Sequence, residues 1–215
     1  MNAEAVLAQG AQELGLALEP ERLQRLLAHM DLLLKWNRVY NLTAVRDPGE
    51  MLTHHLLDCL SVLPPLMRYT RGQALRVLDV GSGGGLPGAV LAICRPELDV
   101  TCVDTVAKKA AFIQQVAVTL GLPQLKGLHA RVETLPGPYD VISSRAFSSL
   151  ADFVKGSRQA LASQGVWMAM KGKHPQEELT ALPVDVSVFH VEPLTVPGLS
   201  AERCIVWMRL AAQDS

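Results

Sequence analysis

The spacing of hydrophobic residues divides the chain into a helical first third and an alternating remainder. Apolar side chains recur at steps of three and four over residues 23–34, which is typical of one face of a helix. Pro20 precedes this pattern at a place where a proline suits the first helical turn. A second helical pattern covers residues 51–63, and we expect Pro64 and Pro65 to end it. Residues 1–70 are therefore predicted to form a helical extension.

After residue 70 the pattern changes to short apolar runs that alternate with helical segments. The runs with the length of strands are residues 76–80, 100–103, 125–130, 139–144, 166–170, 184–191 and 204–210. Helices are predicted between them over residues 86–94, 106–120 and 149–162. This alternation predicts an α/β domain over residues 71–215, with a mostly parallel sheet covered by helices on both faces. The last two runs predict a hairpin-like antiparallel pair.

The first predicted strand contains one acid, Asp79, and leads directly into a glycine-rich loop. Without a Cβ, the backbone at Gly81, Gly83 and Gly85 can approach a ligand closely. The spacing from Gly83 to Gly88 also fits a dinucleotide-binding fingerprint, which is a weak signal when it stands alone. However, Gly81 already fills the place after the strand, and the acid precedes it by two residues, as in motif I of class I methyltransferases. The register therefore favours S-adenosylmethionine, with an ordinary glycine-rich turn as the structural alternative.

Polar residues also stand at the ends of the next three strands, where ligands bind in open α/β sheets. Asp104 can accept the hydroxyl groups of a ribose, or it can cap the next helix. Val132 and Glu133 are placed to contact an adenine ring and its amine, although a surface acid is an equal interpretation. Arg145 carries a planar cation suited to a carboxylate or a phosphate, with a surface salt bridge as the alternative.

Two further groups of residues were considered for chemistry. His54, His55 and Asp58 could suggest a metal site, but adjacent histidines point to different helix faces, so we interpret them as structural and expect no metal. Cations mixed with aromatic residues in the helical region could form a patch for RNA, and so could Lys171 and Lys173 after the fifth strand. Ordinary solvated faces are the competing interpretation of both.

Composition sets wider limits on the class of protein. The chain has 215 residues, of which 49% are hydrophobic and 19% are charged, so it is globular rather than disordered. Its net charge of −1 argues against a positive electrostatic field over the whole surface that would attract nucleic acid. A local patch of basic residues remains compatible with this charge. Four scattered cysteines predict no zinc site or disulfide framework, and we expect a cytoplasmic protein. We see no signal peptide and no apolar run near the roughly 20 residues of a membrane span.

Taken together, these residues resemble the bacterial 16S ribosomal RNA guanine-N7 methyltransferase family, RsmG, also called GidB. The resemblance is carried by residues 36–48, 55–58, 79–88, 144–147 and 171–172. It extends from about residue 20 to residue 210. Cys59 and Met170 depart from the usual serine and leucine of the family. Residues 105–109 match loosely, which weakens any role for Lys108 and Lys109.

The resemblance implies a class I methyltransferase fold, with a Rossmann-like sheet of seven strands. It implies S-adenosyl-L-methionine bound by Gly81, Leu86, Val132, Glu133 and Arg145, to which the residues themselves add Gly83, Gly85 and Asp104. The implied acceptor is N7 of a guanine in the decoding-region loop of 16S ribosomal RNA, and we expect a monomer acting on this RNA or on the small subunit. The candidate RNA contacts are Asn37, Arg38, Arg46, Phe147, Lys171 and Lys173.

Guanine N7 carries a lone pair and no proton, so we expect catalysis by placement, without a general base. Trp36 or Phe147 could stack on the guanine. Two alternatives remain at this point. An NAD-dependent oxidoreductase would need a substrate domain for which the chain has no room, and a non-catalytic RNA-binding module would not need so complete a cofactor loop.

Overall fold

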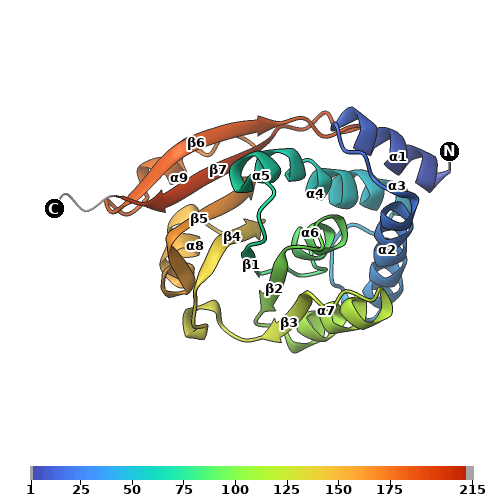
Figure 1. Ribbon diagram of the computed structural model, residues 1–215, viewed down its shortest axis with the longest axis horizontal. Coiled ribbons are helices and arrows are strands. Elements are labelled where there is room, and N and C mark those ends of the chain that lie inside the picture. The colour runs from blue at the N-terminus through green and yellow to red at the C-terminus, as the bar shows by residue number, and fades with distance from the viewer. Residues whose placement is uncertain (1, 212–215) are drawn as a thin grey trace.

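The computed structural model describes residues 2–211, and its centre is a twisted sheet (Figure 1). The strands are β1 (Arg76–Val80), β2 (Asp99–Asp104), β3 (Leu125–His129), β4 (Tyr139–Arg145), β5 (Leu161–Lys171), β6 (Val186–Leu194) and β7 (Arg203–Leu210). Their order is β3-β2-β1-β4-β5-β7-β6, and within residues 2–211 β7 runs in the direction opposite to the other strands. The predicted α/β class and the antiparallel pair at the end of the chain are confirmed.

Helices cover both faces of the sheet because its strands alternate apolar side chains between two cores. Val77 of β1 belongs to the core that contains α6 (Gly88–Cys94) and α7 (Ala107–Thr119). Leu78 and Val80 belong to the core on the opposite face, with α8 (Leu150–Ser157). Parallel strands buried on both faces in this way leave their carboxyl ends as the place for a site.

The N-terminal helices pack on the same face as α6 and α7 (Figure 1). In chain order they are α1 (Ala3–Glu13), α2 (Pro20–Tyr40), α3 (Pro48–Met51), the π-helical turn η1 (Leu52–Leu57), α4 (Asp58–Leu60) and α5 (Leu63–Thr70). Their apolar side chains merge with the core of the sheet, so the division of the chain at residue 70 stays a prediction. Within residues 2–211 we find no helix with the length and hydrophobicity needed to span a membrane.

Prolines explain one success and one error of the sequence analysis. Pro20 opens α2 as expected. The prediction that Pro64 and Pro65 end a helix is wrong, because these residues lie in the first turn of α5. Backbone N–H groups in the first turn of a helix have no acceptor within the helix, so prolines lose no hydrogen bond there. A proline pair can therefore start a helix as well as end one.

Two other segments differ from their predicted structure. The helix expected to continue to Ala162 ends at Ser157, and after the 3₁₀ turn η3 (Arg158–Ala160) strand β5 begins at Leu161. Leu161 pairs with Tyr139 of β4, so pairing across the sheet overrides the local helical pattern. The short helix α9 (Gln176–Thr180) was not predicted.

Candidate functional site

Asp79 holds the glycine loop in place from within the sheet. Its Oδ2 accepts the Gly88 N–H (2.9 Å), and its Oδ1 accepts the Ser143 hydroxyl of β4 (2.9 Å). Burial raises the pKa of Asp79 to about 6, and the two hydrogen bonds oppose this shift. A Cβ on Gly88 would lie 2.3 Å from Cys102 Sγ, so only glycine fits there. Asp79 therefore joins β1, β4 and the start of α6 rather than facing a ligand.

Helix α2 supports the same loop from the other side. The Nε2–H of His29 donates to the Gly84 carbonyl (2.8 Å), while its Nδ1 is buried without a partner among residues 2–211. Burial lowers the pKa of His29 to about 4, so the imidazole is neutral near pH 7. Leu33 lies so close that a Cβ on Gly84 would approach it to 2.7 Å. The N-terminal helices thus help to shape the loop.

A cavity of about 270 Å³ opens beside the loop at the carboxyl ends of the strands. Five residues that the sequence singled out line this cavity, and they come from the ends of four strands. They are Gly81, Asp104, Val132, Glu133 and Phe147. We call it the glycine-loop cavity. Gly81 adopts a φ of 68° there, which favours glycine. Residues far apart in the sequence therefore meet as expected for a ligand site of this fold.

Asp104 both shapes the glycine-loop cavity and faces it. Its Oδ2 accepts the Gly83 N–H (3.1 Å), and its Oδ1 accepts the Val106 N–H (2.9 Å). A carboxylate offers about four lone-pair positions, so further donors can still approach it. The other loop candidates, Gly83, Gly85 and Leu86, lie outside the lining of the cavity, and the Leu86 side chain is buried in the core.

A second cavity, of about 470 Å³, lies on the other side of the end of β4. We call it the Arg145 cavity. It is lined by Thr43, Ala44, Val45, His54, His55, Asp58, Arg145, Ala146, Met170, Lys171, Gly172 and Arg203. Ala146 has a φ of 59°, and this turn sends Arg145 to one cavity and Phe147 to the other. Single residues held at positive φ are typical of functional sites.

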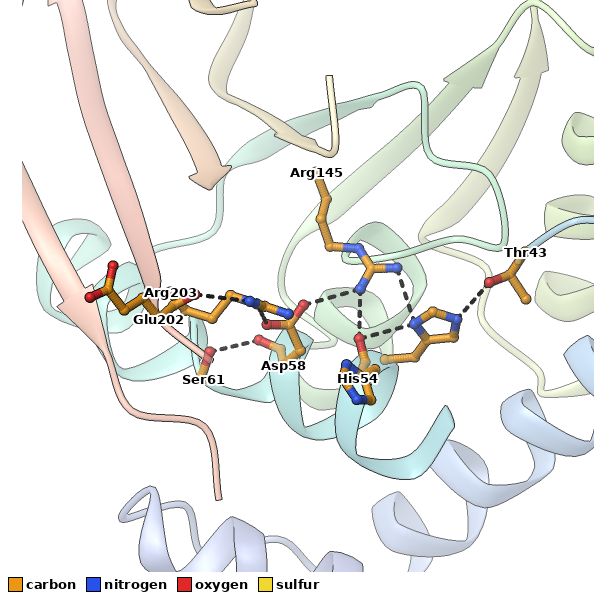
Figure 2. Close-up of polar contacts among 8 residues, drawn as sticks. Thr43, His54, Asp58, Ser61, Arg145, Glu202 and Arg203 are labelled. Atoms are coloured by element: carbon orange, nitrogen blue, oxygen red, sulfur yellow. Dashed lines mark hydrogen bonds and ion pairs between the residues drawn. The ribbon is translucent and has the colours of Figure 1, made fainter. Parts of the chain in front are cut away.

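Arg145 contacts the N-terminal segment rather than the glycine-loop cavity (Figure 2). Its Nη1–H groups donate to the His54 carbonyl (2.9 Å) and to Asp58 Oδ2 (3.1 Å). Arg203 of β7 donates from Nε to the other oxygen of Asp58 (2.9 Å). One buried carboxylate therefore holds two guanidinium groups and ties the N-terminal segment to β4 and β7.

His55 completes this network. Its Nε2 lies 2.8 Å from the Thr43 hydroxyl, and burial followed by the charge of Arg145 lowers its pKa to about 4. These contacts link the π-helical turn η1 to the loop after α2 and to the end of β4. Within residues 2–211 no group of three or more His, Cys, Asp or Glu side chains lies close enough to hold a metal ion.

Two of the candidate RNA contacts are engaged within the protein. Asn37 is buried, with its Oδ1 accepting the Thr43 N–H (2.9 Å) and its Nδ2 donating to the Val45 carbonyl (3.3 Å). Its amide folds the loop that follows α2, and the residue also lines a hollow with Arg38 and Arg46, so its contact with RNA stays a prediction. Lys171 pairs with Glu178 (2.7 Å) at the end of β5.

The remaining RNA candidates lie on the surface or at the glycine-loop cavity. Arg38 and Arg46 are exposed and line an open hollow beside the end of α2, and Lys173 is exposed after β5. Phe147 is half-buried, with its ring 5.6 Å from that of Phe153. Trp36 instead packs edge-on against the buried ring of Phe112 (5.5 Å), so Phe147 is the better candidate for stacking on a base.

Comparison with known proteins places the chain in a family. The family model described as GidB, rRNA small subunit methyltransferase G, matches residues 22–206. The chain belongs to this family. A relative from Acidovorax sp. (strain JS42), named ribosomal RNA small subunit methyltransferase G, is 66% identical over 97% of this chain and 96% of its own length. A relative of the same name from Paracidovorax citrulli is 62% identical over 95% of this chain and 89% of its own length.

Solved structures agree with this family at the level of the fold. A crystal structure titled as a SAM-dependent methyltransferase from Aquifex aeolicus aligns with a TM-score of 0.55 and 18% identity, covering 77% of this chain and 99% of that one. Membership of the GidB family makes the chain a methyltransferase with a class I fold. It also decides against the oxidoreductase and the non-catalytic module that the sequence left open.

Sequence reasoning missed His29 and Arg203, and it interpreted Asp58 as structural without identifying its partners. His29 stood among the leucines on the apolar face of its predicted helix, and a polar residue on a buried face is a signal of a specific partner. Arg203 is the first residue of β7, and the antiparallel pairing of β7 with β5 brings it to the carboxyl ends of the parallel strands.

Proposed function

We propose that the protein transfers the methyl group of S-adenosyl-L-methionine to N7 of a guanine in small-subunit ribosomal RNA. The observation that carries the proposal is the convergence of Gly81, Asp104, Val132 and Glu133 on one cavity beside the glycine loop. This arrangement comes from a chain that belongs to the family of rRNA small subunit methyltransferase G.

The residues of the glycine-loop cavity fit an adenosyl cofactor. A Cβ on Gly81 would point toward Phe147, 3.8 Å from Cδ2, and so would fill space that glycine leaves open. In this proposal Asp104 accepts the ribose hydroxyls, Val132 packs on the adenine and Glu133 accepts its amine. The bound cofactor supplies a methyl group on a positively charged sulfur.

The surroundings suit a reaction that needs no general base. Guanine N7 attacks through its own lone pair and gives up no proton. Two carboxylates close to the end of β4 are held in ion pairs, Asp58 by two arginines and Glu178 by Lys171. The protein's task is then to hold the base in line with the methyl group, and Phe147 is placed to stack on it.

Transfer of labelled methyl groups tests the proposal. Wild-type protein is incubated with labelled S-adenosyl-L-methionine and either naked 16S ribosomal RNA or assembled small subunits, and the modified atom is then mapped. We expect label at N7 of a single guanine. Label on an exocyclic amine, or binding of NAD in place of S-adenosyl-L-methionine in calorimetry, would contradict the proposal.

We also propose that the enzyme acts in the cytoplasm as a monomer. The four cysteines are buried as free thiols, in agreement with a reducing compartment. Sedimentation of the purified protein measures the oligomeric state directly, and a stable dimer would contradict this part of the proposal.

A further inference from the structure

The Arg145 cavity carries positive charge that the methyl transfer itself does not require. Its lining includes three cations, Arg145, Lys171 and Arg203, and one carboxylate, Asp58. Lys171 is balanced by Glu178 behind the cavity wall, and Asp58 balances one of the two arginines. Asp79 in the core also acts on the charge of Arg145, but among the residues that line the cavity the cations outnumber the carboxylate. The volume of about 470 Å³ lies within the range of about 300–1,000 Å³ typical of ligand sites.

Asp58 fixes the orientation of the two guanidinium groups. Its two oxygens are taken by Arg145 Nη1 (3.1 Å) and Arg203 Nε (2.9 Å), so the carboxylate faces the arginines rather than a ligand (Figure 2). Arg203 also donates from Nη1 to the Glu202 carbonyl, whereas its Nη2 has no hydrogen-bond partner among residues 2–211. About a fifth of the Arg203 side chain is exposed, and the residue lines the cavity.

The shape of the cavity also leaves an entry for a ligand. Gly172 lies in its lining, and a Cβ built there would meet nothing within 4 Å. The opposite wall is the loop that contains Thr43, which Asn37 and His55 hold by hydrogen bonds. The cavity therefore has free space at Gly172, a hydrogen-bonded loop in its wall and guanidinium donors in its lining.

We propose that the Arg145 cavity binds a phosphate group of the RNA backbone beside the acceptor nucleotide, with Arg203 as a phosphate ligand; this rests on the proposed function. A phosphodiester carries one negative charge, which the cations in the lining attract, and a guanidinium matches its oxygens with planar donors. Arg145 and Phe147 are separated by one residue, so a base stacked at Phe147 brings its own backbone to this cavity.

The first test compares Arg203→Gln with Arg209→Gln, an arginine at the other end of β7 that packs over Phe189. Affinity for 16S ribosomal RNA is measured over a range of salt concentrations, and affinity for S-adenosyl-L-methionine by calorimetry. For Arg203→Gln we expect about tenfold weaker RNA binding and a salt slope smaller by about 0.7, the value for one phosphate contact on a single strand. Cofactor affinity should stay within about twofold, and Arg209→Gln should change neither quantity.

A second pair of variants does not disturb the ion pairs. Gly172→Glu adds a negative charge to the lining where there is room for a side chain, and Gly172→Gln adds the same bulk without charge. We expect the glutamate variant to bind RNA about tenfold more weakly than the glutamine variant at low salt, with a smaller difference at high salt. Equal RNA affinity of these two variants would overturn the proposal even if Arg203→Gln failed to fold.

Two other outcomes have separate meanings. If Arg203→Gln weakens cofactor binding and leaves the RNA salt slope unchanged, the anion in this cavity is the carboxylate of the cofactor, and the proposal is wrong. If wild-type protein methylates its RNA while neither pair of variants changes RNA affinity, only the phosphate site fails. If wild-type protein transfers no methyl group to RNA, the proposed function itself fails.

Discussion

The two cavities at the carboxyl ends of the parallel strands are assembled in different ways. Each wall of the glycine-loop cavity directly follows β1, β2, β3 or β4, so each wall is a short local signal in the sequence. The Arg145 cavity joins the loop after α2, the π-helical turn η1, the ends of β4 and β5, and the start of β7. A site for a common cofactor can thus be local, whereas the neighbouring site depends on contacts between distant segments.

The two cavities also depend on the N-terminal helices to different degrees. Helix α2 supports the glycine loop from behind through His29 and contributes no lining residue to that cavity. The segment after α2 supplies about half of the lining of the Arg145 cavity, from Thr43 to Asp58. We infer that the sheet and its loops select the cofactor, while the N-terminal segment adapts the same fold to its acceptor.

Of the substitutions near the glycine-loop cavity, Gly88→Ala should cause the largest loss of stability and of cofactor binding. The added Cβ of Gly88→Ala would lie 2.3 Å from Cys102 Sγ and 2.9 Å from Asp79 Oδ2. Overpacking together with loss of the hydrogen bond to Asp79 should lower the free energy of unfolding by about 4 kcal/mol and abolish cofactor binding. Urea unfolding and calorimetry measure the two effects. Gly172→Ala, in open space, is the control, and equal stability of the two variants would show that the core around Cys102 can relax.

Acidification should weaken the contact between α2 and the loop. His29 has a pKa of about 4 in the folded protein against 6.5 ordinarily, so the unfolded chain binds the proton first as pH falls. This group's contribution is complete above about pH 6.5 and is lost as pH falls toward 4, which amounts to about 3 kcal/mol. Asp79 acts in the opposite direction, because its raised pKa lets the folded state bind a proton first between about pH 6 and 3.8.

A matched variant isolates His29 from these other groups. His29→Gln keeps an N–H donor for the Gly84 carbonyl but does not titrate. The free energy of unfolding is measured in urea at several pH values for both proteins. Between pH 7 and 4 the wild type should lose about 3 kcal/mol more than the variant. Parallel pH curves would mean that His29 takes up its proton in the folded state as easily as in the unfolded chain.

Local patterns predicted the sheet and the glycine-loop cavity but not the Arg145 cavity. Apolar runs located the strands, and strand ends supplied Asp104, Val132 and Glu133. The structural role of Asn37 was not predicted, since nothing in the sequence shows that its amide folds the next loop. Arg203 was invisible because its position depends on the antiparallel return of β7 beside β5. Tertiary pairing, which no local window contains, decided the place of Arg203, whereas the partners of Asn37, Thr43 and Val45, lie close along the chain in an irregular loop.

Asp104 both shapes the glycine loop and faces the glycine-loop cavity. A substitution with a smaller expected effect on affinity can separate these two roles. Asp104→Asn keeps an oxygen for one backbone N–H but removes the negative charge and half of the acceptors. We expect S-adenosyl-L-methionine to bind about tenfold more weakly, or about 1.4 kcal/mol, with RNA affinity unchanged. Calorimetry with S-adenosyl-L-methionine checks this. Unchanged cofactor affinity would leave Asp104 with its structural hydrogen bonds alone.

The smallest expected effect lies outside both cavities, on the exposed arginines beside α2. Arg38→Gln removes one charge from an open surface, where screening by salt keeps each contact weak. We expect about threefold weaker binding of 16S ribosomal RNA and a salt slope smaller by about 0.7, because Arg38 would meet the backbone without reading bases. Arg25→Gln, on the same helix and paired with Glu21, is the control. If Arg38→Gln reduces RNA affinity more than Arg203→Gln does, the RNA follows the surface of α2 rather than the Arg145 cavity.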